Sequence, residues 1–158
     1  MAHFEQLHEW SLTPREAIAL QKSLRVRVRI EPLTRGIETV AGADISFDKF
    51  SPVLYAGIVV LRLPSLEVVE EVCVVSETKF PYVPGLLSFR ETPPVLEAWA
   101  MLKTEPDAVM FDGQGIAHPL SYRGCLCRAR HPERRFHFNS ISTSSSSPSR
   151  AYSNSTVA

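Results

Sequence analysis

The sequence predicts an α/β fold, a mixed β-sheet with flanking helices, and three observations lead to this prediction. One helical pattern precedes three strand patterns, and a second helical pattern precedes a fourth strand. A short turn containing proline separates the second and third strand patterns, which is typical of a hairpin. The fourth strand is reached through a helix, as in a crossover connection. Antiparallel and parallel pairs are therefore expected in one sheet.

The first helix is predicted to begin after Thr13. This residue suits the N-cap, Pro14 suits the first helical position, and Glu16 completes a capping box. The helix is expected to run to about Arg27, with one apolar face formed by Ala17, Leu20 and Leu24.

The remaining elements follow from apolar patterns bounded by turn residues. Residues 40–47 are expected to form a buried strand that carries an acid at its middle. Residues 54–63 and 66–75 are expected to form a hairpin with one packed and one wet face. A helix is predicted over about 93–103, and a short buried strand over 108–111.

Composition places the chain among soluble proteins, with the cytoplasm as the expected compartment. The formal net charge is zero, so a nucleic-acid partner would have to be held by a local basic patch. No apolar run reaches the about 18 residues of a membrane span, so no membrane partner is expected. The N-terminus lacks the apolar middle of a signal peptide, and three cysteines do not make a disulfide framework.

The character of the sequence changes near residue 120. Residues 1–119 have the composition of a folded domain, whereas residues 120–158 are rich first in arginine and then in serine. We expect this second segment to be a disordered tail, because it has too little apolar material to offset the entropy of ordering. It contains a candidate zinc motif, formed by Cys125, Cys127, His131 and His137. The motif is weak because its Cys-x-Cys spacing is tighter than structural zinc sites favour.

Three acids stand where this order of elements could bring them together. Asp44 lies within the first strand, Glu91 at the head of the second helix, and Asp112 at the end of the last strand. An acid in a buried strand is costly unless it is paired or bound to a cation. Carboxylate oxygens suit Mg²⁺, for which Mn²⁺ can substitute. The alternative is that these acids are exposed residues at strand ends with no shared site.

A proline-braced aromatic precedes the second of these acids. Pro81 and Pro84 fix their own φ angles and hold Tyr82 and Val83 in extended geometry. An aromatic on a rigid tip beside a metal-binding acid is found where a protein separates stacked bases and then acts on the nucleic acid. The segment is also consistent with an ordinary proline-rich loop between a strand and a helix.

Three segments of the sequence resemble the signature blocks of the endonuclease V family, in that family's order and spacing. They are Val-Ala-Gly-Ala-Asp at 40–44, Pro-Tyr-Val-Pro-Gly-Leu-Leu-Ser-Phe-Arg-Glu at 81–91, and Pro-Asp-Ala-Val-Met-Phe-Asp-Gly-Gln-Gly-Ile-Ala-His-Pro at 106–119. The resemblance implies a ribonuclease H-like fold and a monomeric, Mg²⁺-dependent DNA repair nuclease. Its substrate would be DNA, or RNA, that contains inosine, and the enzyme would cut the second phosphodiester bond 3′ to the deoxyinosine.

The resemblance also implies roles for individual residues. Asp44, Glu91 and Asp112 match the metal-binding, catalytic acids of the family. The strand-separating wedge that contacts DNA is matched by Pro81, Tyr82, Val83 and Pro84, and the pocket for the flipped base by Leu87, Gly113 and Ile116. His118 matches a position beside the metal site, and as a lone histidine it is also consistent with a structural role.

The sequence departs from the family after residue 119. Residues 120–158 do not match the family's continuation, in which a lysine near the scissile phosphate and a late metal ligand are expected, and they resemble the product of a reading-frame slip. The sheet is therefore expected to be incomplete at its C-terminal side. An alternative function follows, in which the chain is a catalytically inactive remnant that at most binds nucleic acid.

Overall fold

A computed structural model of the protein describes residues 8–26, 36–48 and 50–111. In chain order it contains helix α1 (Pro14–Arg25), strands β1 (Thr39–Phe47), β2 (Val53–Arg62) and β3 (Val68–Glu77), helix α2 (Leu87–Met101) and strand β4 (Ala108–Phe111). The tail predicted at 120–158, including its zinc motif, lies outside the described residues. No helix among the described residues is both long and apolar enough to cross a membrane.

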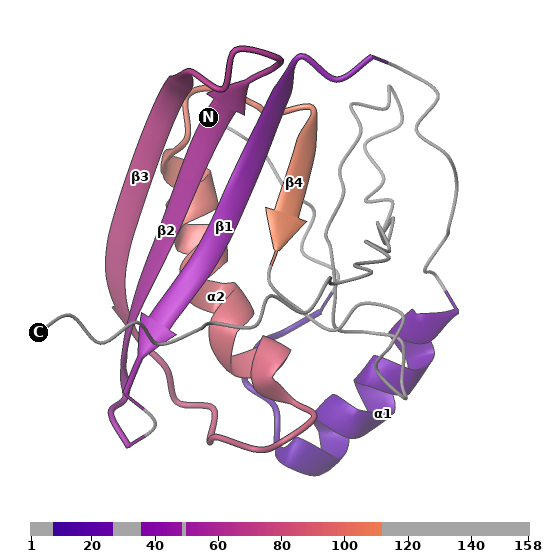
Figure 1. Ribbon diagram of the computed structural model, residues 1–158. Helices are drawn as coiled ribbons and strands as arrows, with labels where there is room; N and C mark the ends of the chain where they lie inside the picture. The colour runs from indigo at the N-terminus through magenta and orange to yellow at the C-terminus, as the bar shows by residue number, and fades with distance from the viewer. Residues whose placement is uncertain (1–7, 27–35, 49, 112–158) are drawn as a thin grey trace, which may run out of the picture.

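The strands form one sheet in the order β3-β2-β1-β4 (Figure 1). β1 and β2 pair antiparallel, as do β2 and β3, whereas β1 and β4 pair parallel. α2 is the crossover that makes the last pair possible, because a parallel neighbour must be entered from the same end of the sheet. The mixed sheet predicted from the order of elements is confirmed.

The start of α1 agrees with the sequence prediction. The Thr13 hydroxyl accepts a hydrogen bond from the backbone N–H of Glu16, and the Glu16 carboxylate accepts one from the backbone N–H of Thr13. These reciprocal bonds satisfy N–H groups that have no partner inside the helix. The helix ends at Arg25, slightly before the predicted end, and it buries Ala17, Gln21 and Leu24.

The predicted start of α2 is wrong. The helix begins at Leu87 rather than near residue 93, so Pro93 and Pro94 lie inside it and Glu91 lies in its second turn rather than at its head. Neither proline can donate to the carbonyl four residues earlier, which usually disfavours a helix interior. Burial of Phe89 and Val95 on either side offsets this cost and holds the first turns in place.

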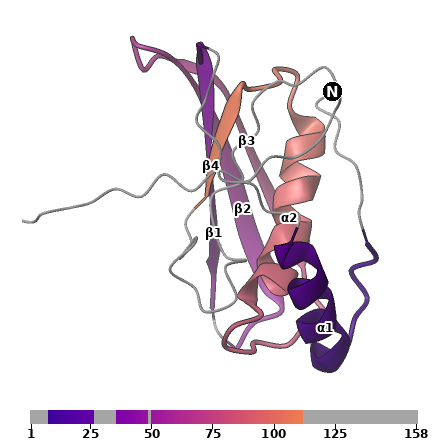
Figure 2. The same ribbon diagram turned by 90° about the vertical axis from the view of Figure 1, so that its right-hand side faces the viewer.

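The two helices lie on one side of the sheet, so that, among the residues the structure describes, one face of the sheet is covered and the other is open (Figure 2). Side chains of β1, β2 and β4 on the covered face pack against α2, and the core contains Ala41, Ala43, Ala56, Ile58, Val60, Val95, Ala98, Trp99, Leu102 and Val109. A second cluster beside α1 contains Ala17, Phe80, Leu86 and Phe89. Successive strand residues point to opposite faces, so each strand contributes to both surfaces.

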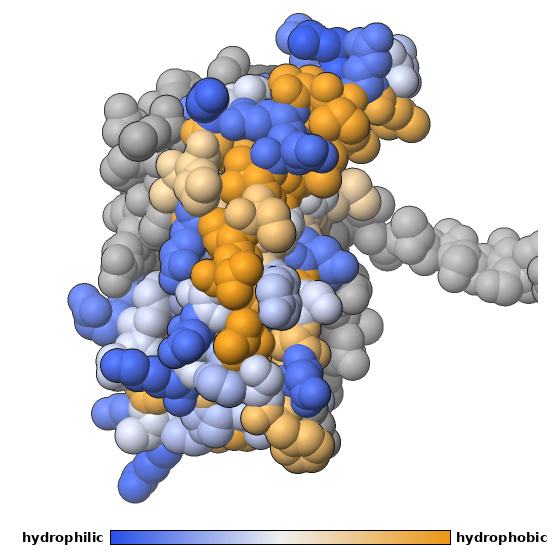
Figure 3. Space-filling model, turned by 90° about the vertical axis from the view of Figure 1, so that its left-hand side faces the viewer, coloured by the Kyte–Doolittle hydropathy of each residue, from blue (hydrophilic) through white to orange (hydrophobic). Residues whose placement is uncertain are grey.

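β3 forms one edge of the sheet, and Figure 3 looks onto this edge. A band of apolar residues runs along it, with hydrophilic residues on either side. Val68 and Val75 of β3 are exposed, while Val72 and Val74 are half-buried against α2. The hairpin of β2 and β3 thus has the packed and wet faces that the sequence predicted.

Candidate metal centre and nucleic-acid interface

Asp44 lies in the second half of β1 on the open face of the sheet. The prediction that it is buried in its strand is wrong, because only the neighbouring Ala43 and Ile45 point toward α2. Its Oδ1 atom accepts a hydrogen bond of 2.8 Å from the backbone N–H of Ile45. An exposed carboxylate needs no buried partner, so the Asp44 side chain is accessible to a cation from solution.

Two glycines leave the surface around Asp44 bare. Gly57 of β2 is the cross-strand partner of Asp44, and Gly42 precedes Asp44 by two residues on the same face. A Cβ added at either glycine would meet no heavy atom within 4 Å. The described side chains therefore leave room beside Asp44 for a bulky ligand to approach the sheet.

Of the other two predicted acids, the structure describes Glu91 but not Asp112. Glu91 is partly buried in the second turn of α2. Asp112 lies outside the described residues, together with the predicted pocket residues Gly113 and Ile116 and with His118. Among the residues that are described, no three His, Cys, Asp or Glu side chains are grouped to hold a metal ion. The shared site of the three acids therefore stays a prediction.

The pairing of β1 with β4 ends next to two of these acids. The parallel register runs from Val40 with Ala108 to Ala43 with Phe111. Asp44 and Asp112 are the residues that follow this last pair in the sequence. The structure thus brings the residue before each acid side by side, although these residues are far apart in the chain.

Asp107, which the sequence analysis did not single out, fixes this register. Its Oδ2 accepts hydrogen bonds from the backbone N–H of Glu38 at 3.1 Å, and from the backbone N–H and hydroxyl of Thr39 at 3.0 and 2.9 Å. The backbone N–H of Asp107 donates in turn to the backbone oxygen of Thr39 at 3.2 Å. The start of β4 is therefore tied to the start of β1. An aspartate directly before a strand was the only sequence signal for this contact.

The proline-braced segment forms an exposed loop between β3 and α2. Tyr82 is 39% exposed, and Pro81 and Pro84 are exposed beside it. The loop closes with a hydrogen bond of 2.9 Å from the backbone N–H of Leu86 to the backbone oxygen of Val83. Gly85 has a φ angle of +88°, which a residue with a side chain rarely adopts, so glycine is required there.

The two ends of this loop are anchored in the second core cluster. Phe80 and Leu86 are buried against Phe89 and Ala17, and Val83 is half-buried against the same cluster. Leu87, the described member of the predicted base pocket, is partly exposed at the first position of α2. The predicted wedge and this pocket residue therefore lie on one continuous stretch of chain with buried ends.

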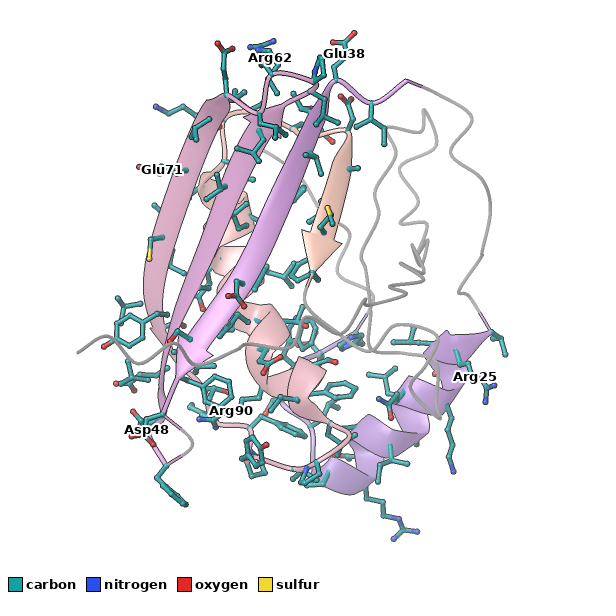
Figure 4. The ribbon with its side chains drawn as sticks, in the orientation of Figure 1. Arg25, Glu38, Asp48, Arg62, Glu71 and Arg90 are labelled. Carbon is teal, nitrogen blue, oxygen red and sulfur yellow. The ribbon has the colours of Figure 1, made fainter. Side chains whose placement is uncertain are left out.

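Two buried polar side chains contact this loop, and neither was identified from the sequence. Gln21 of α1 has no exposed surface, and Arg90 of α2 is only 5% exposed. Figure 4 shows Arg90 at the end of the sheet where β1 leads to Asp48. Sequence patterns do not mark such residues, because a glutamine or arginine on a helix is normally a solvent-facing residue.

Comparisons with known proteins agree with the resemblance seen in the three segments. The family model described as Endonuclease V matches residues 22–125. The chain is 47% identical over 115 residues to the Endonuclease V of Gloeobacter violaceus, which covers 72% of this chain and 47% of the relative. It is 45% identical over 120 residues to the Endonuclease V of Myxococcus xanthus, which covers 75% of this chain and 51% of the relative. The chain thus spans about half the length of these relatives.

Solved structures give the same result for the fold. The crystal structure of the Endonuclease V from Streptomyces avermitilis is 42% identical, with a TM-score of 0.65 over 72% of this chain and 50% of that chain. Human ENDOV is 31% identical, with a TM-score of 0.62 over 70% and 52%. The mixed sheet with flanking helices, which the resemblance implied to be ribonuclease H-like, matches these structures.

Two of the similar structures contain nucleic acid. One of them is an Asp-to-Asn variant of the Ciona intestinalis Endonuclease V in complex with a 23mer DNA that contains an inosine followed by a ribo-adenosine. That protein is 25% identical to the present chain, with a TM-score of 0.62 over 72% of this chain and 52% of that chain.

Proposed function

The chain belongs to the endonuclease V family, and from this premise we propose that it is a nuclease for inosine-containing nucleic acid. The proposed reaction is hydrolysis of the second phosphodiester bond 3′ to a deoxyinosine in DNA, or to an inosine in RNA, with Mg²⁺ as the cofactor. The proposed partner is the damaged nucleic acid, which the protein would bind as a monomer in the cytoplasm.

The observation that carries this proposal is the position of Asp44. It is an exposed carboxylate on the open face of the sheet, beside bare glycine positions, and it directly follows Ala43, which pairs with Phe111. Asp112 is next in sequence after Phe111. The pairing joins the residues that precede these two acids, and this supports the proposal that Asp44 and Asp112 share a cation.

The donor set fits the proposed ion. Asp44, Asp112 and Glu91 would supply only carboxylate oxygens, which are the ligands that Mg²⁺ and Mn²⁺ prefer, with water in the remaining positions. When bound, such an ion polarises a phosphodiester and lowers the pKa of a coordinated water. The acids of the chain would fix the position of the scissile phosphate and balance the charge of the site.

The loop between β3 and α2 would supply recognition. Tyr82 is exposed on a tip braced by Pro81 and Pro84, so its ring can enter between bases and separate the strands at the lesion. A base displaced from the duplex would then enter the pocket that we assign to Leu87, Gly113 and Ile116, with His118 near the metal. Removing a base from the stack costs a few kcal/mol, and the cost is least where pairing is already weak.

The experiment is a cleavage assay of the purified chain on a labelled duplex with a single deoxyinosine in the presence of Mg²⁺. We expect a cut at the second phosphodiester bond 3′ to the lesion, no cut in the matched undamaged duplex, and no activity after addition of EDTA. The variant Asp44→Asn should abolish cleavage while leaving the unfolding midpoint unchanged, because Asp44 is exposed. Glu71→Gln is the matched control, since Glu71 is an exposed acid on the same face of the edge strand β3.

The same assay distinguishes the alternative function. Because the chain spans about half the length of its relatives, it could bind nucleic acid through the loop without cutting it. Retained preference for the deoxyinosine duplex without cleavage would favour this inactive form. Cleavage that persists in Asp44→Asn would contradict the assignment of Asp44 as a metal ligand.

A further inference from the structure

The loop of residues 80–86 is held at both ends by buried polar side chains that come from two different helices. We propose that Arg90 and Gln21 are positioning residues that keep this loop rigid, so that the wedge residues separate the bases and the loop itself does not move. This inference rests on the proposed function, because it assigns a purpose to the loop in opening a duplex. It concerns neither a metal ligand nor a residue that contacts the lesion.

Arg90 holds the first end of the loop. Its Nη1 atom donates a hydrogen bond of 2.8 Å to the backbone oxygen of Phe80, and its Nη2 atom donates to the backbone oxygen of Ser51. One guanidinium thus ties α2 to both the start of the loop and the segment between β1 and β2. A planar group with donors on two branches is needed for this, and an ammonium group cannot replace it in the same geometry.

A chain of ring contacts extends from Arg90 to the tip. The Cζ atom of Arg90 lies 5.3 Å from the centroid of the Phe47 ring, within the range of a cation–π contact. The Phe47 ring lies 6.4 Å from the ring of Tyr82. The exposed tyrosine therefore rests on a ring that itself lies on a buried cation, which limits movement of the tip toward the sheet.

Gln21 holds the second end of the loop. Its Nε2 atom donates a hydrogen bond of 3.1 Å to the backbone oxygen of Gly85, the residue with positive φ at which the chain turns into α2. The Oε1 atom of Gln21 is buried and has no hydrogen-bond partner among the described residues. A buried acceptor without a partner is unfavourable for stability. Gln21 therefore lowers the stability of the fold through this acceptor. Its presence favours a role in positioning the Gly85 carbonyl.

Rigidity matters for a wedge and not for binding in general. Separating stacked bases costs a few kcal/mol. A flexible loop would be displaced by the bases instead of separating them. A single strand needs no separation. Loss of the anchors should therefore weaken binding to a duplex with one deoxyinosine far more than binding to the same single strand.

The test compares Gln21→Met and Arg90→Lys with the wild-type chain in equilibrium binding, with Ca²⁺ in place of Mg²⁺. The two probes are a duplex and a single strand, each with one deoxyinosine beside a 2-aminopurine that reports unstacking. We expect affinity for the duplex to fall about tenfold or more, a loss of about 1.4 kcal/mol, and affinity for the single strand to change less than about threefold. The 2-aminopurine signal in the bound duplex should fall in both variants.

A stability control separates this role from general destabilisation. Val60→Ala removes buried apolar volume from the other core cluster, whose members include neither loop residues nor the two anchors. It should lower the unfolding midpoint without changing the ratio of duplex to single-strand affinity. Hydrogen exchange of the 80–86 segment should rise in Gln21→Met and Arg90→Lys under conditions where the rest of the sheet stays protected. Gln21→Met alone carries the test if Arg90→Lys does not fold.

The outcomes separate the two proposals. Equal losses on duplex and single strand, or unchanged exchange in the loop, would overturn the role of Gln21 and Arg90. A wild-type chain that binds deoxyinosine and undamaged duplexes alike would overturn the proposed function and the role in strand opening with it. In that case the exchange data still decide whether the two side chains hold the loop.

Discussion

The two faces of the sheet are made by the same four strands but differ in what their side chains contact. On the covered face, Ala43, Ile58 and Val109 are buried against α2. On the open face, Tyr55 and Met110 are each 51% exposed. Asp44 lies beside Gly57, which has no side chain, and a Cβ added there would meet no atom within 4 Å. The covered face therefore provides the apolar burial that stabilises the domain, whereas the open face carries the proposed chemistry.

The difference explains how an acid can lie in the second half of a strand without destabilising the fold. Because side chains alternate along a strand, Asp44 shares its backbone with buried neighbours while its carboxylate stays in contact with water. Packing on the covered face fixes the position of the Asp44 backbone, and exposure on the open face lets water solvate its carboxylate. Mutations on the two faces should consequently separate stability from activity.

The largest expected effect concerns Ile58 and Val59, which are adjacent in β2 and lie on opposite faces. Ile58 has no exposed surface, so Ile58→Ala should lower the free energy of unfolding by about 3–4 kcal/mol through lost burial and a residual cavity. Val59 is 37% exposed, and Val59→Ala should cost less than about 1 kcal/mol. Urea denaturation of both variants gives the comparison, and similar losses would contradict the assignment of one covered and one open face.

The next-largest effect concerns Asp107, which fixes the register of β4 with β1. This register decides which β4 residues lie on each face of the sheet. Asp107→Ala removes the acceptor of three hydrogen bonds to Glu38 and Thr39 and should lower the free energy of unfolding by about 2–3 kcal/mol. A shift of one residue between β1 and β4 would exchange the faces of the shifted strand. We therefore expect Asp107→Ala to reduce Mg²⁺-dependent cleavage more than its loss of stability explains.

The matched control for Asp107 is Asp48→Ala at the opposite end of β1. The Asp48 side chain accepts one backbone hydrogen bond, from Phe50 at 3.0 Å, and it lies in an exposed turn. Its removal should cost less than about 1 kcal/mol. Thermal unfolding monitored by circular dichroism, together with cleavage of the deoxyinosine duplex, measures both variants, and equal effects would argue against a special role for Asp107.

The sequence predicted those parts of the molecule that depend on local patterns. The capping box of Thr13 and Glu16 is a contact between residues three apart, and the hairpin consists of two strand patterns separated by a short turn at Pro64 and Ser65. Such features can be inferred without knowing the fold. The start of α2 could not, because burial of Phe89 overrides the signal of Pro93 and Pro94 as a helix start.

The candidate site was predicted unevenly for a related reason. The motifs identified Asp44, Glu91 and Tyr82, but they could not tell that Asp44 faces away from the core, since this depends on which face α2 covers. Gln21, Arg90 and Asp107 contact partners between 10 and 69 residues away in the sequence. No local pattern marks a polar side chain whose partner is supplied by another element.

A smaller effect, of opposite sign, is expected at Gly57 beside Asp44. Glycine inside a strand is unfavourable by about 0.5–1 kcal/mol relative to alanine, and an added Cβ meets no atom within 4 Å. Gly57→Ala should therefore raise the free energy of unfolding by about this amount, and Gly57→Val should lower cleavage by filling space beside Asp44. Denaturation and kinetics on the same samples test this, and full activity of Gly57→Val would show that the bare area is not used.

The smallest expected effect compares Glu70 and Glu71, which are adjacent on β3 and point to the covered and open sides. The Glu70 carboxylate accepts backbone hydrogen bonds from Lys103 at 2.9 Å and Thr104 at 2.8 Å, and the bond from Lys103 is the main cause of its lowered pKa. A carboxyl group whose pKa is lower in the folded state stabilises the protein above its unfolded pKa of 4.5, and this contribution is lost as the pH falls through the folded value. Glu16 acts in the same direction through its bonds to Thr13.

Glu70→Gln should therefore reduce stability at neutral pH and flatten its fall with acid, while Glu71→Gln should leave the fall unchanged. The difference will be small because Glu70 is largely solvated, so the urea midpoint must be measured for each variant at a series of pH values from neutral to below 4.5. The Glu16 contribution is common to all three proteins and cancels in the comparison. If the Glu70→Gln curve runs parallel to that of the wild type, the tie between β3 and the end of α2 does not contribute to holding the covered face together.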